Sequence, residues 1–365
     1  MNEKNHEVST KLKLIRQILS ETEAQALRLR GTDWFAWATA GGSNTVLLTA
    51  ETGIAEVLIT TQEAWILTDE IEAQRLQDEE LPSNFQIHVS PWVDVATRED
   101  FVRDVTDGGK VISDRPLPHI EKRLPASLIA HKRVMMSTEL ERYRQVGRKA
   151  SEAMTEVLNA ALPTWTEYQL AGAGAEALWA RGLHPALTLV AGEKRLPLYR
   201  HATATGEVIG RQAMMVFCAR GYGLYANLTR FVCFGALADE KALLHKHVRE
   251  IEAVVLNLSQ SGTSLDAAYN ALAQAYEQHG FPYAIHQHHQ GGTTGYLARE
   301  IVANPLTTDT LTENMAVAWN PSLPGAKVED TFAIVDGKLE NLTFDPNFPN
   351  VEVEGRLRPI PLEIR

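Results

Sequence analysis

Residues 216–231 (VFCARGYGLYANLTRF) are two mostly apolar runs that meet at the Gly-Tyr-Gly triplet 221–223. Such a pattern predicts a β-hairpin whose strands are half or fully buried. The segment contains neither Asp nor Glu. Divalent metal ions in hydrolytic sites are bound chiefly by Asp and Glu, often with one His. We therefore expect this hairpin to contribute no metal ligand, and its chemistry has to come from other side chains.

A second segment shows the same feature. Asn320-Pro321-Ser322 is polar and uncharged, and the acidic pair Glu329-Asp330 follows it along the chain. The first of these segments therefore offers no anionic oxygen to a divalent ion.

The bulk composition limits the classes of function. A chain of 365 residues is long enough for two domains. Hydrophobic residues make up 44% and charged residues 22%, as in ordinary soluble proteins. The net charge of −11 argues against nucleic acid and anionic membranes as partners, because both attract basic surfaces.

Cysteine content and hydropathy indicate the compartment. Only Cys218 and Cys233 are present, both in apolar runs, so we expect buried thiols in a reducing environment. The N-terminus is polar, and no window approaches the ~20 apolar residues of a membrane span. The sequence predicts a soluble, cytoplasmic protein without a membrane partner.

The N-terminal third alternates between helical and strand-like patterns, which favours an α/β unit. Helices are predicted at about 9–30, 70–80 and 96–106. Strands are predicted at 34–37, 45–49, 55–59, 64–67 and about 86–90. The proline-rich stretch 115–125 is a plausible edge of this domain.

The remainder favours long helices separated by antiparallel strands. Three capping boxes predict helix starts. They are Thr138–Glu141 before a helix at about 139–161, Thr164–Glu167 before a helix to about Gly182, and Thr263–Asp266 before a helix that ends at Gly280.

Five motifs follow one another in the order typical of the M24 family, which includes creatinase, prolidase and aminopeptidase P. They are Tyr199-Arg200-His201, residues 223–230 (GLYANLTR), 288–295 (HHQGGTTG), 318–321 (AWNP) and 327–331 (KVEDT). The chain resembles that family over nearly its whole length. The resemblance implies an α+β protein with a pita-bread catalytic-type domain at 133–365, preceded by a smaller α/β creatinase/prolidase-type domain at 1–132.

The metallopeptidases of that family hold two metals with two Asp, one His and two Glu. The resemblance places these ligands near Val216 or Phe217, on Asn227, near Thr293, on Asn320 and on Glu329. Only the last is a carboxylate, and two neighbouring dications need several negative charges. We expect no dinuclear metal site and no cofactor.

Creatinase implies a route without metal, the hydrolysis of a carbon–nitrogen bond. This chain resembles it in His201 and Glu329, whereas its other substrate glutamate matches Thr229. His201 could act as general base, or it could be a structural histidine. Glu329 could bind a substrate ammonium or orient His201, or it could form a structural ion pair with Arg230 or Lys327.

The remaining candidates are polar side chains that could contact substrate. They are Asn227, Thr229, His288, His289, Thr293, Arg299 and Asn320. Arg299 could anchor a carboxylate through its planar fork, or simply be solvated. In a strand, His286 and His288 would share a face, but two imidazoles alone make a poor metal site, so substrate contact by His288 or His289 is favoured.

Three hypotheses remain open. The first is a metal-independent hydrolase of an amide, amidine or related C–N bond in a small molecule, with His201 as general base. The second is a catalytically silent binding protein of the same fold, and the third a remodelled metallopeptidase. The resemblance also implies a homodimer.

Overall fold

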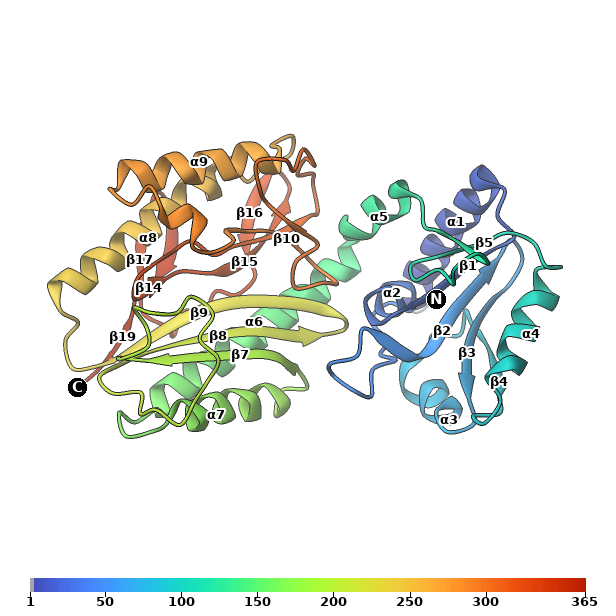
Figure 1. Cartoon of the computed structure of the whole chain (residues 1–365), viewed down its shortest axis with the longest axis horizontal. Helices are drawn as coiled ribbons and strands as arrows, with labels where there is room; N and C mark the ends of the chain where they lie inside the picture. The colour runs from blue at the N-terminus through green and yellow to red at the C-terminus, as the bar shows by residue number, and fades with distance from the viewer. Residues whose placement is uncertain (1–2) are drawn as a thin grey trace. The chain divides into compact units, whose positions relative to one another are not determined.

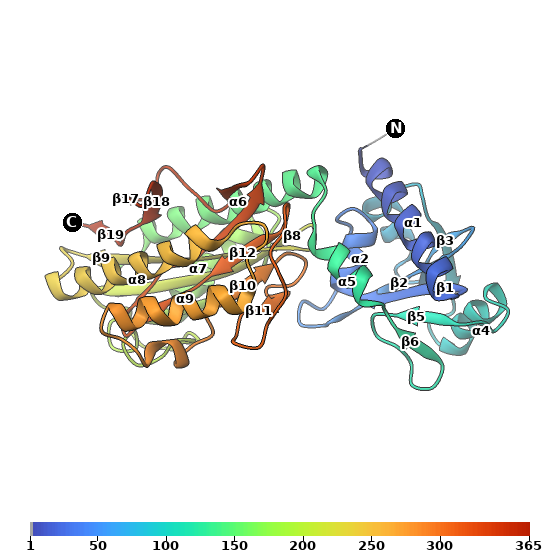
Figure 2. The same cartoon turned by 90° about the horizontal axis from the view of Figure 1, so that it is seen from above.

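The computed structural model describes residues 3–365. These divide into two compact units, which are treated separately (Figures 1 and 2). The first comprises the chain up to Glu139 together with 222–224. The second comprises Leu140–Gly221 and Tyr225–Arg365.

The first unit is built on a six-stranded mixed sheet with the order β4-β3-β2-β1-β5-β6. Its strands are β1 (Ala26–Gly31), β2 (Thr52–Thr60), β3 (Ala64–Asp69), β4 (Gln86–Ser90), β5 (Val111–Ser113) and β6 (Glu121–Arg123). Its helices are α1 (Glu3–Thr22), α2 (Thr32–Ala38), α3 (Ala73–Arg75), the π-helix η1 (Leu76–Glu80), α4 (Val95–Val105) and α5 (Ala126–Arg133). Helix α4 packs Val102 against Leu58 and Trp65 of the sheet.

Three sequence predictions for this unit are wrong. The first helix ends at Thr22, and Leu27, within the predicted helix, lies in the buried strand β1. Residues 34–37 lie in helix α2 instead of a strand, and all of α2 is buried. An apolar run of four residues fits a buried turn of helix as well as a strand. Residues 45–49 form no regular element. The strands at 55–59, 64–67 and 86–90 are confirmed.

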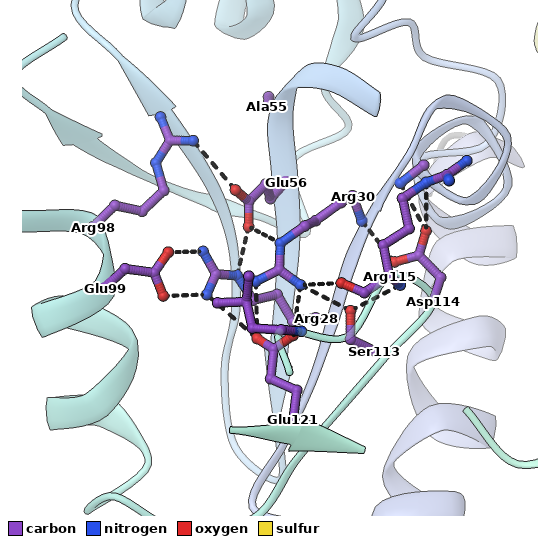
Figure 3. A network of polar contacts seen from close by, with 12 residues as sticks. Arg28, Arg30, Ala55, Glu56, Arg98, Glu99, Ser113, Asp114, Arg115 and Glu121 are labelled. Atoms are coloured by element: carbon purple, nitrogen blue, oxygen red, sulfur yellow. Dashed lines mark hydrogen bonds and ion pairs between the residues drawn. The ribbon is translucent and has the colours of Figure 1, made fainter. Parts of the chain in front are cut away.

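A network of buried charges lies across this sheet (Figure 3). Arg28, only 1% exposed, pairs with Glu99 at 2.6 Å, with Glu56 at 2.5 Å and with Glu121 at 3.4 Å. Arg30 pairs with Glu121 at 2.7 Å. Burial alone would lower the pKa of Arg28, but Glu99 and Glu56 raise it. The buried charge of Arg28 is therefore compensated by the carboxylates that surround it.

The second unit consists of two halves, each with a pair of long helices against a sheet. In the first half, α6 (Ser137–Ala160) and α7 (Glu167–Trp179) cover a sheet with the order β19-β9-β8-β7. Its strands are β7 (His184–Gly192), β8 (Gln212–Gly221), β9 (Leu224–Phe234) and β19 (Leu362–Ile364). Val146 and Met154 of α6 and Phe217 of β8 belong to its core.

The second half has α8 (Asp239–Leu258) and α9 (Leu265–Gln278) against a sheet with the order β11-β10-β12-β15-β16. The strands are β10 (Gly291–Thr294), β11 (Ile301–Val302), β12 (Ala316–Trp319), β15 (Asp330–Val335) and β16 (Lys338–Asn341). Two small hairpins, β13 (Ser322–Leu323) with β14 (Ala326–Lys327) and β17 (Asn350–Val353) with β18 (Arg356–Pro359), complete it. In Figure 1, α9 lies above the strands of this unit and α7 lies below them.

The predicted hairpin is confirmed as β8 and β9. Tyr222 and Gly223 form its turn with φ of 53° and 80°, the left-handed values that a tight two-residue hairpin turn requires. Both cysteines of the chain are free thiols, and burial raises the pKa of each to about 11.

Strand β9 is joined to the other sheet by hydrogen bonds. The backbone N–H of Thr229 donates to the carbonyl of Glu329 at 3.0 Å. Asn227 donates its N–H to the hydroxyl of Thr331 at 2.8 Å. This seam brings the second and fifth sequence motifs together, and a hydrogen bond from Asn227 Nδ2 to Thr294 Oγ1 at 3.0 Å adds the third.

No helix in residues 3–365 is long and apolar enough to cross a membrane.

Candidate active site

Glu329 is the centre of a buried ion cluster in the second unit. Its Oε1 accepts a hydrogen bond from Arg299 Nη2 at 2.6 Å. Its Oε2 lies 3.0 Å from Lys327 Nζ and accepts from the hydroxyl of Thr229 at 2.9 Å. Glu329 directly precedes β15, Lys327 ends β14, Thr229 lies on β9 and Arg299 lies in the loop between β10 and β11. The seam described above therefore creates this cluster.

The charge state of Glu329 follows from its neighbours. Burial by itself would raise the pKa of this carboxyl, but Lys327 and Arg299 outweigh that effect and hold the pKa at about 2. Glu329 is thus ionised, and both of its oxygens have partners. The structure contains the ion pair with Lys327 that was one reading of the sequence. Arg230 instead donates to the Glu329 backbone carbonyl at 3.3 Å and pairs with Asp330 at 2.7 Å.

Three imidazoles form a second cluster in this unit. The Nε2 atoms of His201 and His288 are 2.8 Å apart. His288 and His289 stack with ring centroids 4.5 Å apart. One ring nitrogen from each of the three residues lies within 4.8 Å of the others. His201 lies in the loop between β7 and β8 and is exposed, whereas His288 and His289 are half-buried.

The expectation that His286 and His288 share the face of a strand is wrong. Residues Ala284–His286 form the 3-10 helix η2, and the two histidines after it lie in the turn that leads into β10. His286 is exposed and is not part of the cluster. His201, distant in sequence, takes its place.

The three imidazoles are neutral at neutral pH. Burial, followed by the charge of Lys327, lowers the pKa of His288 to about 2. Burial, followed by the charge of Arg299, lowers the pKa of His289 to about 4. Partial burial and Lys327 also lower the pKa of His201, even though part of its ring is open to solvent. Each ring can therefore donate through one nitrogen and accept through the other.

A residue that sequence reasoning missed holds the histidine loop. Gln290 is fully buried, and its Nε2 donates to the carbonyl of His288 at 2.6 Å. Its Oε1 accepts from the hydroxyl of Tyr276 at 2.9 Å, and that hydroxyl accepts from the backbone N–H of Ser322 at 2.8 Å. The only sequence signal for Gln290 is that it is a polar residue directly after the two histidines. A buried glutamine needs hydrogen-bond partners for its amide, so it could have been considered as a support for this loop.

Several buried polar atoms near these clusters have no hydrogen-bond partner within the described chain. They are Asn227 Oδ1, His288 Nδ1, Thr293 Oγ1, Arg299 Nε and Asn320 Oδ1. Asn227 is held at its other end, because its Nδ2 donates to Thr294 Oγ1 at 3.0 Å. Buried polar groups are almost always satisfied, so unpaired ones mark places where a polar ligand could bind.

The side chains around Glu329 do not fit a pair of divalent metals. Within residues 3–365, Glu329 supplies the one carboxylate of this cluster. The ammonium of Lys327 and the guanidinium of Arg299 already bind it. The neighbouring Asp330 is engaged elsewhere, by Arg230 at 2.7 Å and Arg358 at 2.8 Å. Two dications would add four positive charges next to Lys327 and Arg299 with no further anion to compensate them.

The three imidazoles, by ligand type, could hold a single transition-metal ion. The same two cations, Lys327 and Arg299, oppose that binding electrostatically, since both already disfavour a positive charge on these rings.

Comparison with known proteins agrees with this architecture. The sequence model of metallopeptidase family M24 matches residues 141–336, more than half of the chain. No curated protein sequence matches. Among solved structures, the X-Pro aminopeptidase from Thermotoga maritima MSB8 is 17% identical with a TM-score of 0.76, over 92% of this chain and 98% of that one.

Two further structures are similar. The Xaa-Pro dipeptidase from Bacillus anthracis is 16% identical with a TM-score of 0.77, over 98% of this chain and 100% of that one. The N-terminal domain of FACT complex subunit SPT16 from Cicer arietinum (chickpea) is 13% identical with a TM-score of 0.72, over 93% and 96%. Such identities establish the fold alone. The predicted α+β class, with an N-terminal domain before a pita-bread domain, is confirmed.

Proposed function

Because the chain belongs to metallopeptidase family M24, we propose that it is a hydrolase that cleaves a C–N bond of a small molecule without a dinuclear metal centre. The bond is an amide, an amidine or a related group, and His201 is the general base. The observation that carries the proposal is the binding of Lys327 and Arg299 to Glu329, which places two fixed cations at the one family ligand position that keeps its carboxylate.

Fixed cations can replace a metal in one of its roles. Attack on a carbonyl or amidine carbon builds negative charge, and a preorganised ammonium or guanidinium stabilises that charge in a desolvated site. Lys327 is 6% exposed, so its charge is little screened by water. In this scheme Glu329 is a positioning residue, because its oxygens hold the two cations in place.

His201 supplies the proton transfers. The ring donates Nε2–H to His288 Nε2, which leaves the lone pair of Nδ1 free. Nδ1 takes a proton from water, the resulting hydroxide adds to the substrate carbon, and the C–N bond then breaks. The leaving amine receives the proton from Nδ1. The lowered pKa of His201 favours this role, because the ring stays neutral at neutral pH.

Substrate binding is assigned to side chains that have unused polar atoms. Asn227, Thr293 and Asn320 each present a buried oxygen that has no hydrogen-bond partner among residues 3–365. Arg299 presents its Nε in addition to the fork that binds Glu329. His289 adds an Nε2–H donor, because its Nδ1 already accepts from Gly291 N–H at 3.3 Å. Thr229 is already bound to Glu329.

The test is turnover of a library of small amides, amidines and ureido compounds in the presence of EDTA. We expect activity to survive EDTA and to fall at least about 100-fold in His201→Ala. The matched control is His286→Ala, an exposed histidine outside the cluster, which keeps wild-type rates. Full activity in His201→Ala would refute the general-base role. Loss of activity in EDTA, restored by added metal, would instead favour a remodelled metallopeptidase.

A catalytically silent binding protein is the second candidate, and one observation favours it. Both oxygens of Glu329 are engaged, so this carboxylate is not free to contact a substrate or orient His201. A ligand that co-crystallises with no water within reach of His201 would support this reading.

For either candidate we propose a small-molecule ligand, a cytoplasmic location and a homodimer. A monomer in light scattering at micromolar concentration would contradict the homodimer.

A further inference from the structure

Two histidines and a glutamate converge between α8 and α9, away from the residues assigned above. His247 and Glu250 lie on α8, and His279 is the C-cap residue of α9. One ring nitrogen of each histidine and one carboxylate oxygen all lie within 4.8 Å of one another. The two imidazole rings have centroids 5.1 Å apart and are inclined at 70°.

The backbone preorganises this triad. His247 and Glu250 are three residues apart on one helix, a spacing that places both side chains on the same face. Helix α9 packs against α8 through a shared apolar core, to which Ile251 and Ala275 belong. His279 therefore reaches the α8 pair from a fixed position, and the three groups meet without any rearrangement of the helices.

The distances fit a tetrahedral metal ion. Glu250 Oε2 is 3.2 Å from His279 Nε2 and 3.5 Å from His247 Nδ1. In a tetrahedral zinc site with bonds of about 2.0–2.2 Å, two ligand atoms lie roughly 3.3–3.5 Å apart. The carboxylate oxygen thus stands at ligand-to-ligand distance from both nitrogens.

The hydrogen bonds of the triad also support metal binding. His279 Nδ1 lies 2.8 Å from the carbonyl of Ala275, which can only accept, so Nδ1 carries the proton. The other ring nitrogen, Nε2, lies 3.2 Å from Glu250 Oε2 and is the ring atom that faces the proposed metal position. A backbone carbonyl on the far ring nitrogen is the usual support of a metal-binding histidine. His247 Nδ1 is likewise buried and has no hydrogen-bond partner within residues 3–365.

We propose that His247, Glu250 and His279 form a binding site for one divalent transition-metal ion, with Zn²⁺ the best fit. Two imidazoles and one carboxylate suit zinc and related ions. The side chains are 24%, 35% and 21% exposed, so an ion can enter from solvent, and a water can occupy the fourth position. Lys246 Nζ lies 3.7 Å from the other oxygen of Glu250, but its side chain is 63% exposed and free to turn away.

The first test is a calorimetric titration of chelator-treated protein with Zn²⁺. We expect one site, weakened at least 100-fold in Glu250→Gln and in His279→Ala. Lys246→Gln, a charge change on the same helix, is the matched control and binds Zn²⁺ within threefold of wild type. His288→Ala separates this site from the active-site imidazoles and also binds normally. Unchanged affinity in Glu250→Gln and His279→Ala, or loss of binding in His288→Ala alone, would overturn the proposal.

A second test uses the wild-type protein, so it does not depend on the folding of a variant. Histidines are modified with diethyl pyrocarbonate, and the sites are mapped by mass spectrometry. Zn²⁺ should slow modification of His247 and His279 at least tenfold and leave the exposed His119 unaffected. Zn²⁺ at a hundredfold its dissociation constant should also raise the Tm by roughly 5 °C. Equal modification rates with and without Zn²⁺ would contradict a site at these residues.

Discussion

Glu329 balances two buried cations with one carboxylate. It is 2% exposed, and its partners Lys327 and Arg299 have little access to water. Charges buried in this way remain tolerable only while each is compensated. The cluster therefore makes the site dependent on a single acidic side chain, both for the position of the cations and for stability.

Replacing Glu329 by Gln should destabilise the protein strongly. The amide keeps the shape of the side chain but leaves Lys327 and Arg299 without a counter-charge, so the free energy of unfolding should fall by roughly 3–5 kcal/mol. Urea denaturation measures this value. Glu352→Gln changes an exposed side chain on β17 that makes no hydrogen bond or ion pair in the described chain, and it should change the free energy of unfolding by less than about 0.5 kcal/mol. Equal stability of the two variants would show that the cations have another partner.

The pH dependence of turnover should report the neutral form of His201. Burial and Lys327 lower the pKa of this ring from its ordinary value of about 6.5. A general base acts when it is unprotonated, so kcat/KM should rise with pH, reach half its maximum below pH ~6.5 and stay level through neutrality. A pH–rate profile measures this midpoint. An acid limb centred above pH 7 would contradict the assignment of His201 as base.

At the scale of elements, helix starts are set by backbone geometry as well as by residue type. Helix α7 begins after Thr166, whose hydroxyl accepts from Gln169 N–H while the Gln169 side chain accepts from Thr166 N–H. The predicted box, Thr164–Glu167, is displaced by two residues. Glu167 is fully buried and accepts from Gly192 N–H at 2.8 Å, so its carboxylate holds a strand end and loop backbone in place of a cap.

The other two predicted boxes behave differently. Helix α6 starts at Ser137, one residue before Thr138, and Glu139 accepts from Met136 N–H at 2.9 Å. Helix α9 begins at Leu265 after Ser264, and the Ser264 hydroxyl accepts no hydrogen bond from a backbone N–H of the helix. All three predicted helices are present. The capping box of α7 is formed by Thr166 and Gln169, two residues after the predicted one.

The matched pair Thr166→Ala and Thr164→Ala tests the position of the α7 cap. Loss of the Thr166 hydroxyl leaves a helix N–H without its partner and should cost about 1 kcal/mol of stability. Thr164 is exposed and makes no side-chain hydrogen bond in the described structure, so its replacement should cost less than about 0.5 kcal/mol. Chemical denaturation of both variants decides the point, and a larger loss for Thr164→Ala would favour the cap expected from sequence.

At the scale of the whole molecule, each compact unit has its own buried charge network. Arg28 joins strands and helix α4 in the first unit, and the Glu329 cluster joins two sheets in the second. Units with separate cores can unfold as separate cooperative transitions. A substitution in either network should therefore lower the unfolding temperature of the unit that contains it.

Arg28→Ala should therefore destabilise only the first unit. The substitution removes the cation shared by Glu56, Glu99 and Glu121. Arg30 still pairs with Glu121 and Arg98 with Glu56, so the cost should lie near the lower end of the range for a broken buried pair, about 3 kcal/mol. Scanning calorimetry should show two transitions, one of which moves to lower temperature in Arg28→Ala and the other in Glu329→Gln. A single transition that shifts equally in both variants would show that the units unfold together.

The sequence by itself determined the family, the α+β class and the strands with strong local patterns, such as 55–59 and the hairpin of β8 and β9. It also indicated that carboxylates are scarce at the family's ligand positions, because the residue type at each of these positions is read directly from the sequence. Local propensity and periodicity act over a few residues, so they carry this information without the fold. They failed at 34–37, where burial on all sides removes the periodic signal.

Only the tertiary structure decided which side chains meet. Arg299 and Lys327 close on Glu329, His201 joins His288 from 87 positions away, and His279 completes a triad with two residues of α8. These contacts follow from the packing of helices and from the seam between two sheets. Sequence spacing does not encode them, because a contact between distant residues depends on every element that folds between them.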